Sequence, residues 1–189
     1  MINKWNFQTP SEEELHKRDQ LVAELGFSPV ICLLLVQRGI TSIEEAKKFF
    51  KPSLNDLHDP FLMPDMDKAV RRLNKALGNK EKILIYGDYD VDGTTAVSLV
   101  FKYLRPYSST LDFYIPDRYD EGYGISYKGI DYAAENGVSL VISLDCGIKA
   151  IEKIEYAKEK GIDFIICDHH MPDATLPDAV AVLDANLSV

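Results

Sequence analysis

Carboxylate side chains alternate along one short stretch of the sequence, GDYDVDG at residues 87–93. The stretch follows an apolar, β-branched run at residues 83–86, which has the length and composition of a buried parallel strand. The aspartates Asp88, Asp90 and Asp92 repel one another, and a divalent cation would relieve that repulsion because hard cations prefer carboxylate oxygen. The pattern predicts a metal site.

The elements that must position these acids alternate between strand and helix patterns from residue 82 onward. Such alternation indicates a parallel sheet with right-handed crossovers. The predicted strands are residues 83–86, 111–115, 140–144, 164–167 and 179–183. We therefore expect an α/β fold, a parallel doubly wound sheet of about five strands with helices on both faces. A helix at 68–77 has one apolar stripe and should lie on this sheet.

A different pattern precedes the sheet. A capping box at Ser11–Glu14 opens the first of three short amphipathic helices, whose apolar faces are expected to pack on one another. An irregular connector follows at 54–64. We expect two parts: a helical N-terminal extension with its connector at residues 1–80, and the acid-bearing α/β domain at 81–189.

An aspartate follows each of the first four predicted strands within two residues of its end. These four are Asp88, Asp117, Asp145 and Asp168. The carboxyl ends of parallel strands share one edge of the sheet, so acids remote in sequence should converge there. A single aspartate after a strand is more often a helix cap. Four of them, with Asp90, Asp92 and His169 as further partners, favour a metal site.

The candidate ligands are rich in oxygen, with one or two imidazoles, which suits Mn²⁺ or Mg²⁺ better than Zn²⁺. The number of acids suggests two ions that share a carboxylate, hold an attacking hydroxide and stabilise charge on a phosphoryl group. This chemistry indicates hydrolysis of phosphoesters or phosphoanhydrides. We expect His169 to ligate and His170 to face the substrate as a donor or acid, unless both are surface loop residues.

Other residues are candidates for contacts with substrate. Gly93 would let the backbone approach the metals, and Gly122 and Gly124 would form a flexible loop. Arg118 is either a phosphate contact or part of an exposed salt bridge. No Walker A or G-x-G-x-x-G pattern occurs, which disfavours a nucleotide-cofactor enzyme.

Bulk properties exclude some classes. The formal net charge of −9 argues against a broad basic surface for nucleic acid, although bound metal ions can still receive phosphates. The three cysteines lack zinc-type spacing and are expected to be buried reduced thiols. No apolar run approaches the length of a membrane span. We expect a soluble, cytoplasmic protein with no membrane partner.

Three motifs resemble, in order and spacing, the first three motifs of the DHH phosphoesterase superfamily. They are GDYDVDG at 87–93, LDCG at 144–147 and DHH at 168–170. Three further segments resemble the single-strand-specific bacterial exonucleases within that superfamily. These are HDPFLMPDMDKAVRRL at 58–73, IPDRYDEGYGIS at 115–126 and LPDAVAV at 176–182. The resemblance thus runs from about residue 40 to the end.

The resemblance implies a Mn²⁺- or Mg²⁺-dependent 5′→3′ exonuclease on single-stranded DNA in repair and recombination, with partners such as a helicase or a single-strand-binding protein. It also implies roles for individual residues. The implied ligands are Asp90, Asp92, Asp145 and His169, with Asp145 as the bridge. Asp88 would be a ligand or lie just behind the ligands, Asp168 would orient the histidines, and His170 would meet the scissile phosphate.

The sequence departs from these exonucleases after the DHH motif. They are longer, with a further acidic motif, a second domain of the DHHA1 type and an OB-fold that holds DNA, whereas this sequence stops at VLDANLSV, residues 182–189. We expect a fragment that folds but is catalytically impaired. Two alternatives remain: an oligonucleotide or small-nucleotide phosphodiesterase or pyrophosphatase of the same superfamily, and a non-catalytic metal-binding or protein-interaction domain.

Overall fold

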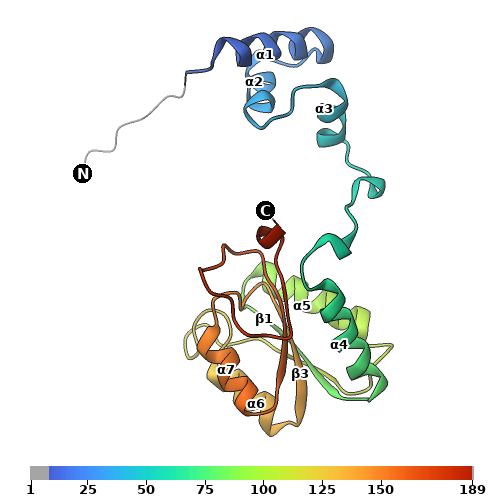
Figure 1. Cartoon of the computed structure of the whole chain (residues 1–189), viewed down its shortest axis with the longest axis vertical. Coiled ribbons are helices and arrows are strands. Elements are labelled where there is room, and N and C mark those ends of the chain that lie inside the picture. Colours follow the sequence, from blue (N-terminus) through green and yellow to red (C-terminus); the bar gives the residue numbers. More distant parts are fainter. Residues whose placement is uncertain (1–8, 189) are drawn as a thin grey trace, which may run out of the picture. The chain divides into compact units, whose positions relative to one another are not determined.

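The computed structural model describes residues 9–188, and the chain divides into two compact units, residues 1–58 and 59–189 (Figure 1). The first unit contains the helices α1 (Glu12–Leu25), α2 (Pro29–Gln37) and α3 (Ile43–Phe50). A serine side chain caps the start of each, and the predicted capping box at Ser11 is confirmed. The helices bury a shared apolar core, as predicted; its buried members are Leu21, Cys32, Leu35, Val36 and Ala46.

The second unit is built on a five-stranded parallel sheet in the order β2-β1-β3-β4-β5. The strands are β1 (Lys82–Gly87), β2 (Leu111–Tyr114), β3 (Val138–Leu144), β4 (Asp163–Cys167) and β5 (Ala181–Leu183). This confirms the predicted fold class. The strand order reverses between β1 and β3, and in open α/β sheets ligands bind beside the carboxyl ends of strands at such a switch point.

Helices cover both faces of the sheet, with α4 and α5 on one side and α6 and α7 on the other (Figure 1). Their bounds are α4 (Met66–Gly78), α5 (Val91–Leu104), α6 (Tyr127–Glu135) and α7 (Ile151–Glu159). Short 3₁₀ turns lie at η1 (Leu54–Asp56), η2 (Pro60–Leu62) and η3 (Ala185–Ser188). Ala69 and Ala76 of α4 lie in the core beneath the sheet, so the predicted packing of this helix is confirmed.

Helix α5 begins at Val91, directly after Asp90. The Asp90 carboxylate caps it by accepting a 3.0 Å hydrogen bond from the Gly93 amide. A side chain at Gly93 would place a Cβ 2.7 Å from the Asp88 backbone nitrogen, so glycine is needed for this close approach. Asp92 consequently lies in the first helical turn and not in the loop.

All three cysteines are free thiols: Cys32 and Cys146 are buried and Cys167 is partly buried, in agreement with the sequence prediction. Among residues 9–188, no helix has both the length and the apolar composition needed to cross a bilayer.

The loop at residues 117–126 is held against β1 by a buried tyrosine. The Tyr86 hydroxyl donates to the Gly124 carbonyl and accepts from the Ser126 amide, both at 3.0 Å. Glu121 accepts from the hydroxyls of Tyr114 and Ser126 and from the Asp117 amide. We expected a flexible loop around Gly122 and Gly124, but these bonds anchor it.

Replacing Tyr86 by phenylalanine should destabilise the second unit by about 1–3 kcal/mol, because two buried backbone groups lose their hydrogen-bond partner. Urea unfolding followed by tyrosine fluorescence measures this, since all ten tyrosines lie between residues 86 and 156. Tyr132→Phe is the matched control, because its hydroxyl meets only the part-buried Asp112 side chain. Equal losses in both variants would contradict the anchoring role of Tyr86.

Candidate metal centre

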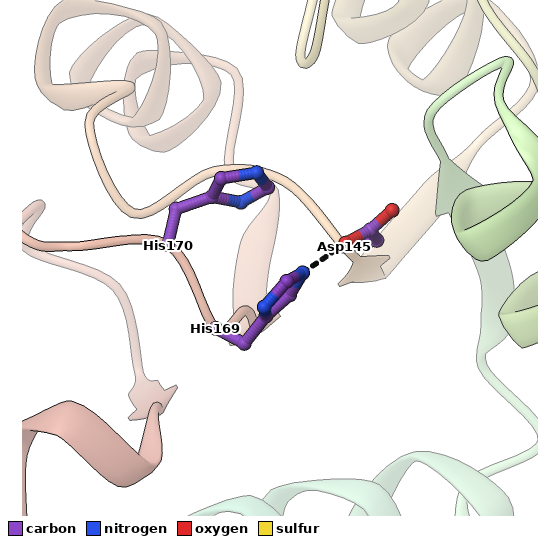
Figure 2. Close-up of side chains that lie close together, drawn as sticks. All are labelled: Asp145, His169 and His170. Carbon is purple, nitrogen blue, oxygen red and sulfur yellow. Dashed lines mark hydrogen bonds and ion pairs between the residues drawn. The ribbon is translucent and has the colours of Figure 1, made fainter. Parts of the chain in front are cut away.

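Three side chains from two strand ends form the core of the candidate site. Ligand atoms of Asp145, His169 and His170 all lie within 4.8 Å of one another. Asp145 follows β3 and the histidines follow β4, so neighbouring strands bring them together. Figure 2 shows the Asp145 carboxylate and the His169 ring turned toward each other, with His169 Nε2 at 2.9 Å from Asp145 Oδ1.

Asp145 is held in an unusual backbone conformation. Its φ of 62° lies in the left-handed region, which aspartate tolerates better than most residues, and its amide donates to the Cys167 carbonyl at 2.8 Å. The side chain is only 8% exposed. Burial raises the pKa of this carboxyl, the His169 contact lowers it, and the negative charge of Asp90 raises it again. The position therefore favours a bound cation.

Asp168 organises the loop that carries the histidines. Its carboxylate accepts from the amides of Ile148 (3.0 Å), His169 (2.7 Å) and His170 (3.2 Å), and lies 2.7 Å from His170 Nδ1. Burial alone would raise the pKa of Asp168, but these hydrogen bonds hold it below its usual value. The hydrogen bond that the His170 ring donates to Asp168 raises the pKa of His170 in turn.

Tyr123 reaches the same place from the anchored loop, and the sequence reasoning missed it. Its hydroxyl lies 3.2 Å from His170 Nε2 and 3.3 Å from the Asp145 carbonyl oxygen. Burial and the charges of Asp88, Asp145 and Asp168 raise the pKa of Tyr123. Its place between two glycines in a loop after a strand was the available signal.

Asp88 lies beneath this group and is fully buried. Its Oδ1 accepts from the Gly124 amide at 3.2 Å, and its Oδ2 has no hydrogen-bond partner within residues 9–188. Gly124 has a φ of 77°, a conformation that suits glycine. Burial raises the pKa of the Cys146 thiol, and the charges of Asp168, Asp88 and Asp145 raise it further. All three carboxylates therefore act on the same buried side chain.

Asp90 and Asp92 lie at the edge of the cluster and outside its tightest group. Asp90 uses one oxygen to cap α5, and its charge raises the pKa of Asp145. Asp92 lines a cavity of about 510 Å³ together with Asp145 and His169. Both acids therefore lie close enough to the candidate site to add negative charge there.

Asp117, the fourth strand-end aspartate, has a local role. Its carboxylate accepts from the amides of Tyr119 (2.8 Å) and Asp120 (3.0 Å), as a turn cap does.

The guanidinium carbon of Arg118 lies 5.3 Å from the centroid of the Tyr89 ring. None of the ion pairs within residues 9–188 involves Arg118. Its charge is thus free of an acidic partner in the described part of the chain.

Asp184 was also missed, although it follows the fifth strand as Asp88, Asp145 and Asp168 follow theirs. It is fully buried; its Oδ1 accepts from the Asn186 amide, and its Oδ2 has no partner in the described part of the chain. The Asn186 side chain donates to the His169 carbonyl at 2.8 Å. The strand-end rule, applied to the fifth strand, would have found it.

The donor set fits a divalent ion of the Mn²⁺ or Mg²⁺ type. The 4.8 Å cluster found among the described residues has one carboxylate and two imidazoles and contains no cysteine, while Asp90 and Asp92 add carboxylates at its edge. A fully buried carboxylate oxygen without a donor, such as Asp88 Oδ2, is costly unless a cation or water satisfies it. These residues can therefore hold the ion that the sequence predicted.

Fold and donor set together define a parallel α/β domain with a candidate divalent-cation site at the carboxyl edge of its sheet. The chain belongs to the DHH family, whose N-terminal domain matches residues 82–188. It is similar to the single-stranded-DNA-specific exonuclease RecJ of Bacillus subtilis, with 41% identity over 95% of this chain, and to that of Escherichia coli, with 34% identity over 92%.

Solved structures of RecJ proteins are also similar to this chain. RecJ from Thermus thermophilus in complex with Mn²⁺ superposes on 92% of this chain with a TM-score of 0.68 and 25% identity. Another exonuclease RecJ, bound to manganese, covers 69% of this chain with a TM-score of 0.63 and 28% identity. The chain spans only 22% and 29% of the B. subtilis and E. coli proteins, and 24% and 34% of these two solved chains.

The Glu121 anchor should give the second unit a defined pH dependence. Burial alone would raise the pKa of Glu121, but hydrogen bonds from Ser126, the Asp117 amide and Tyr114 lower it. A depressed folded-state pKa stabilises the fold above the ordinary value of about 4.5, and this contribution is lost as pH falls through the folded-state pKa. Glu121→Gln should therefore cost about 1–2 kcal/mol at pH 7 and progressively less below pH 4.5.

Urea unfolding of Glu121→Gln and the parent chain between pH 3 and pH 7 measures this difference. The exposed substitution Glu135→Gln on α6 is the control and should leave stability unchanged within about 0.5 kcal/mol. A gap between parent and Glu121→Gln that stays constant down to pH 3 would rule out the proposed ionic anchor.

Proposed function

We propose that this chain is the metal-binding part of a DHH-family phosphodiesterase that degrades single-stranded DNA from its 5′ end in repair and recombination. The observation that carries the proposal is the cluster of Asp145, His169 and His170 at the carboxyl ends of β3 and β4 in a DHH-family sheet. The RecJ proteins to which the chain is similar are single-stranded-DNA-specific exonucleases, and their solved structures contain manganese.

Mn²⁺ or Mg²⁺, as two ions in the complete enzyme, would be held mainly by Asp145 and His169. Asp145 would be the shared ligand, because it is the carboxylate in the cluster found among the described residues. Asp90 and Asp92 would add carboxylate oxygens from the edge of the cluster, and Asp88 its orphaned Oδ2. When bound, such ions supply charge neutralisation at the phosphoryl oxygens and a lowered pKa for water.

The protein's own side chains would donate the proton and bind the substrate. Hydrolysis breaks a phosphorus–oxygen bond, and the leaving 3′ oxygen must gain a proton. His170 would supply it, since its ring belongs to the cluster and its contact with Asp168 raises its pKa. Asp168 positions the ring at Nδ1, and the Tyr123 hydroxyl restrains it at Nε2. Arg118 would receive further phosphate oxygens, and the loop glycines Gly122 and Gly124, whose amides already donate to Asp117 and Asp88, would leave room for the substrate. Gly93 lets α5 approach the acids.

This assignment also gives the parts of the chain their roles. Residues 81–189 would carry the catalytic chemistry, and residues 1–80 would form an extension with its connector, whose last part, residues 59–80, belongs to the same compact unit as the sheet. Free thiols suit a reducing compartment, which supports a cytoplasmic location. Helicases and single-strand-binding proteins are the partners that exonuclease action on single strands would require.

Metal binding should stabilise the second unit through Asp145. With Mn²⁺ at about 100 times its dissociation constant, the unfolding free energy should rise by about 2.7 kcal/mol, because only the folded state gathers the ligands. Asp145→Asn should abolish this rise while tolerating the left-handed backbone. Differential scanning fluorimetry with Mn²⁺, Mg²⁺ and EDTA measures the effect.

The matched control is Asp117→Asn, the same chemical change at a strand-end aspartate whose bonds are local. This variant should respond to Mn²⁺ as the parent chain does. An equal loss of the Mn²⁺ response in both variants, or no response in the parent chain, would refute the assigned site.

Activity distinguishes the exonuclease from its relatives with other substrates. With Mn²⁺, the complete product of this reading frame should release mononucleotides from 5′-phosphorylated single-stranded DNA faster than it cleaves a dinucleotide or pyrophosphate. His170→Ala should lower kcat by about 10²- to 10⁴-fold with Mn²⁺ binding retained, because it removes a proton donor and leaves Asp145 and His169 in place. Preference for pyrophosphate or the dinucleotide would refute the exonuclease assignment.

A further inference from the structure

A second cavity is lined by His170 and shares Asp168 with the Asp92 cavity. It has a volume of about 550 Å³, within the range of small-ligand pockets. Its apolar lining consists of the exposed Met171 and the almost fully buried Ile125 and Ile148, and Tyr123 and His170 form the side next to the candidate metal centre. A ligand in this cavity would therefore touch the two rings assigned to the substrate side.

Two lysines, Lys149 and Lys153, complete the cavity lining. Lys149 lies 3.4 Å from the exposed carboxylate of Asp173, whereas none of the ion pairs found in residues 9–188 includes Lys153. Asp168 also lines the cavity, but three amides and the His170 ring already compensate its charge. The cavity thus carries cationic side chains in a chain whose net charge is −9.

The start of α7 adds to the positive electrostatic potential of the cavity. Its N-cap residue, Ala150, lines the cavity and offers no side-chain capping bond, so the first amides of the helix keep their donors for another partner. Apolar surface and cationic groups side by side match a ligand with an aromatic base and a phosphate. Neither an inorganic anion nor an apolar molecule alone would use both.

We propose that this cavity is a nucleotide subsite, in which the base packs on Ile125, Ile148 and Met171 and the phosphate lies near Lys153. The inference rests on the proposed function, since it supplies the position of one nucleotide beside the scissile phosphate. Lys153 is the positioning residue for that nucleotide, and it acts on binding and not on the hydrolytic step.

Nuclear magnetic resonance of the 189-residue chain with labelled Ile, Ala and Met methyl groups tests the subsite. With saturating Mg²⁺, thymidine 5′-monophosphate should shift the signals of Ile125, Ile148, Ala150 and Met171 and leave that of Ile83, on the other face of the sheet, unmoved. Thymidine and inorganic phosphate should each bind more weakly than the nucleotide. Equal binding of either one alone overturns the subsite.

Charge reversal at Lys153 gives the residue-level test. Lys153→Glu should raise the dissociation constant of the nucleotide by about tenfold or more, and Lys153→Ala should move it less in the same direction. Lys158→Glu is the matched control, because it makes the same change on the same helix at a lysine that pairs with exposed Asp178. It should change the constant by no more than about twofold. Equal effects at Lys153 and Lys158 overturn the proposal.

The same spectra separate failure of the subsite from failure of the proposed function. Mg²⁺ alone should shift the methyl signals of labelled residues that lie near Asp145 and His169. Metal shifts without nucleotide shifts would reject the subsite and leave the metal centre intact. If Mg²⁺ produces no shifts, the proposed function fails, and the nucleotide titration in EDTA then tests the cavity alone.

Discussion

Burial of negative charge at the junction of β1 and β3 is the constraint on which the second unit depends. Asp88 is fully buried, Asp145 is nearly so, and only 1% of the Asp168 side chain is exposed. An ionised carboxylate without partners is far too costly in such a place. The fold compensates Asp168 with four donors, but it leaves Asp88 with one amide and Asp145 with one imidazole. The uncompensated charge is concentrated at one point, and a divalent ion matches it.

The same constraint accounts for local features that have no other purpose in the fold. Asp145 adopts a left-handed backbone at the end of β3, and α5 approaches so closely that residue 93 must be glycine. The loop at 117–126 brings the Gly124 amide to Asp88, and Tyr86 and Glu121 fix the loop from behind. These features bring hydrogen-bond donors to the acids or leave room beside them. The loop and the strand ends together therefore support the candidate metal site.

Much of this arrangement could be predicted because its signals are local. A buried parallel strand is a continuous apolar run, and an aspartate directly after it lies at the carboxyl edge whatever the remaining packing. The sheet and the convergence of Asp145 with His169 follow from that rule. Asp184 follows from it as well, and it was missed because the rule was applied only to the first four strands.

What the sequence could not supply are contacts that depend on the path of a loop. Tyr123 meets His170 across 47 positions, and only the bonds that anchor residues 117–126 bring them together. Asp117 fits the strand-end pattern as well as Asp145 does, yet β2 is an edge strand, and its aspartate turns back to cap its own loop. Strand order separates these two acids, and strand order is a property of the whole sheet.

The two adjacent histidines have different partners because of the way the loop after β4 is held. The Asp168 carboxylate binds both of their backbone amides, which fixes the turn and sends the rings to different partners. His169 reaches Asp145 beside one cavity, and His170 remains with Asp168 and Tyr123 beside the other. Asp168 lines both cavities, so a shift of this one carboxylate would move the proposed ligand His169 and the proposed proton donor His170 together. That shared dependence gives Asp168 a positioning role for both rings.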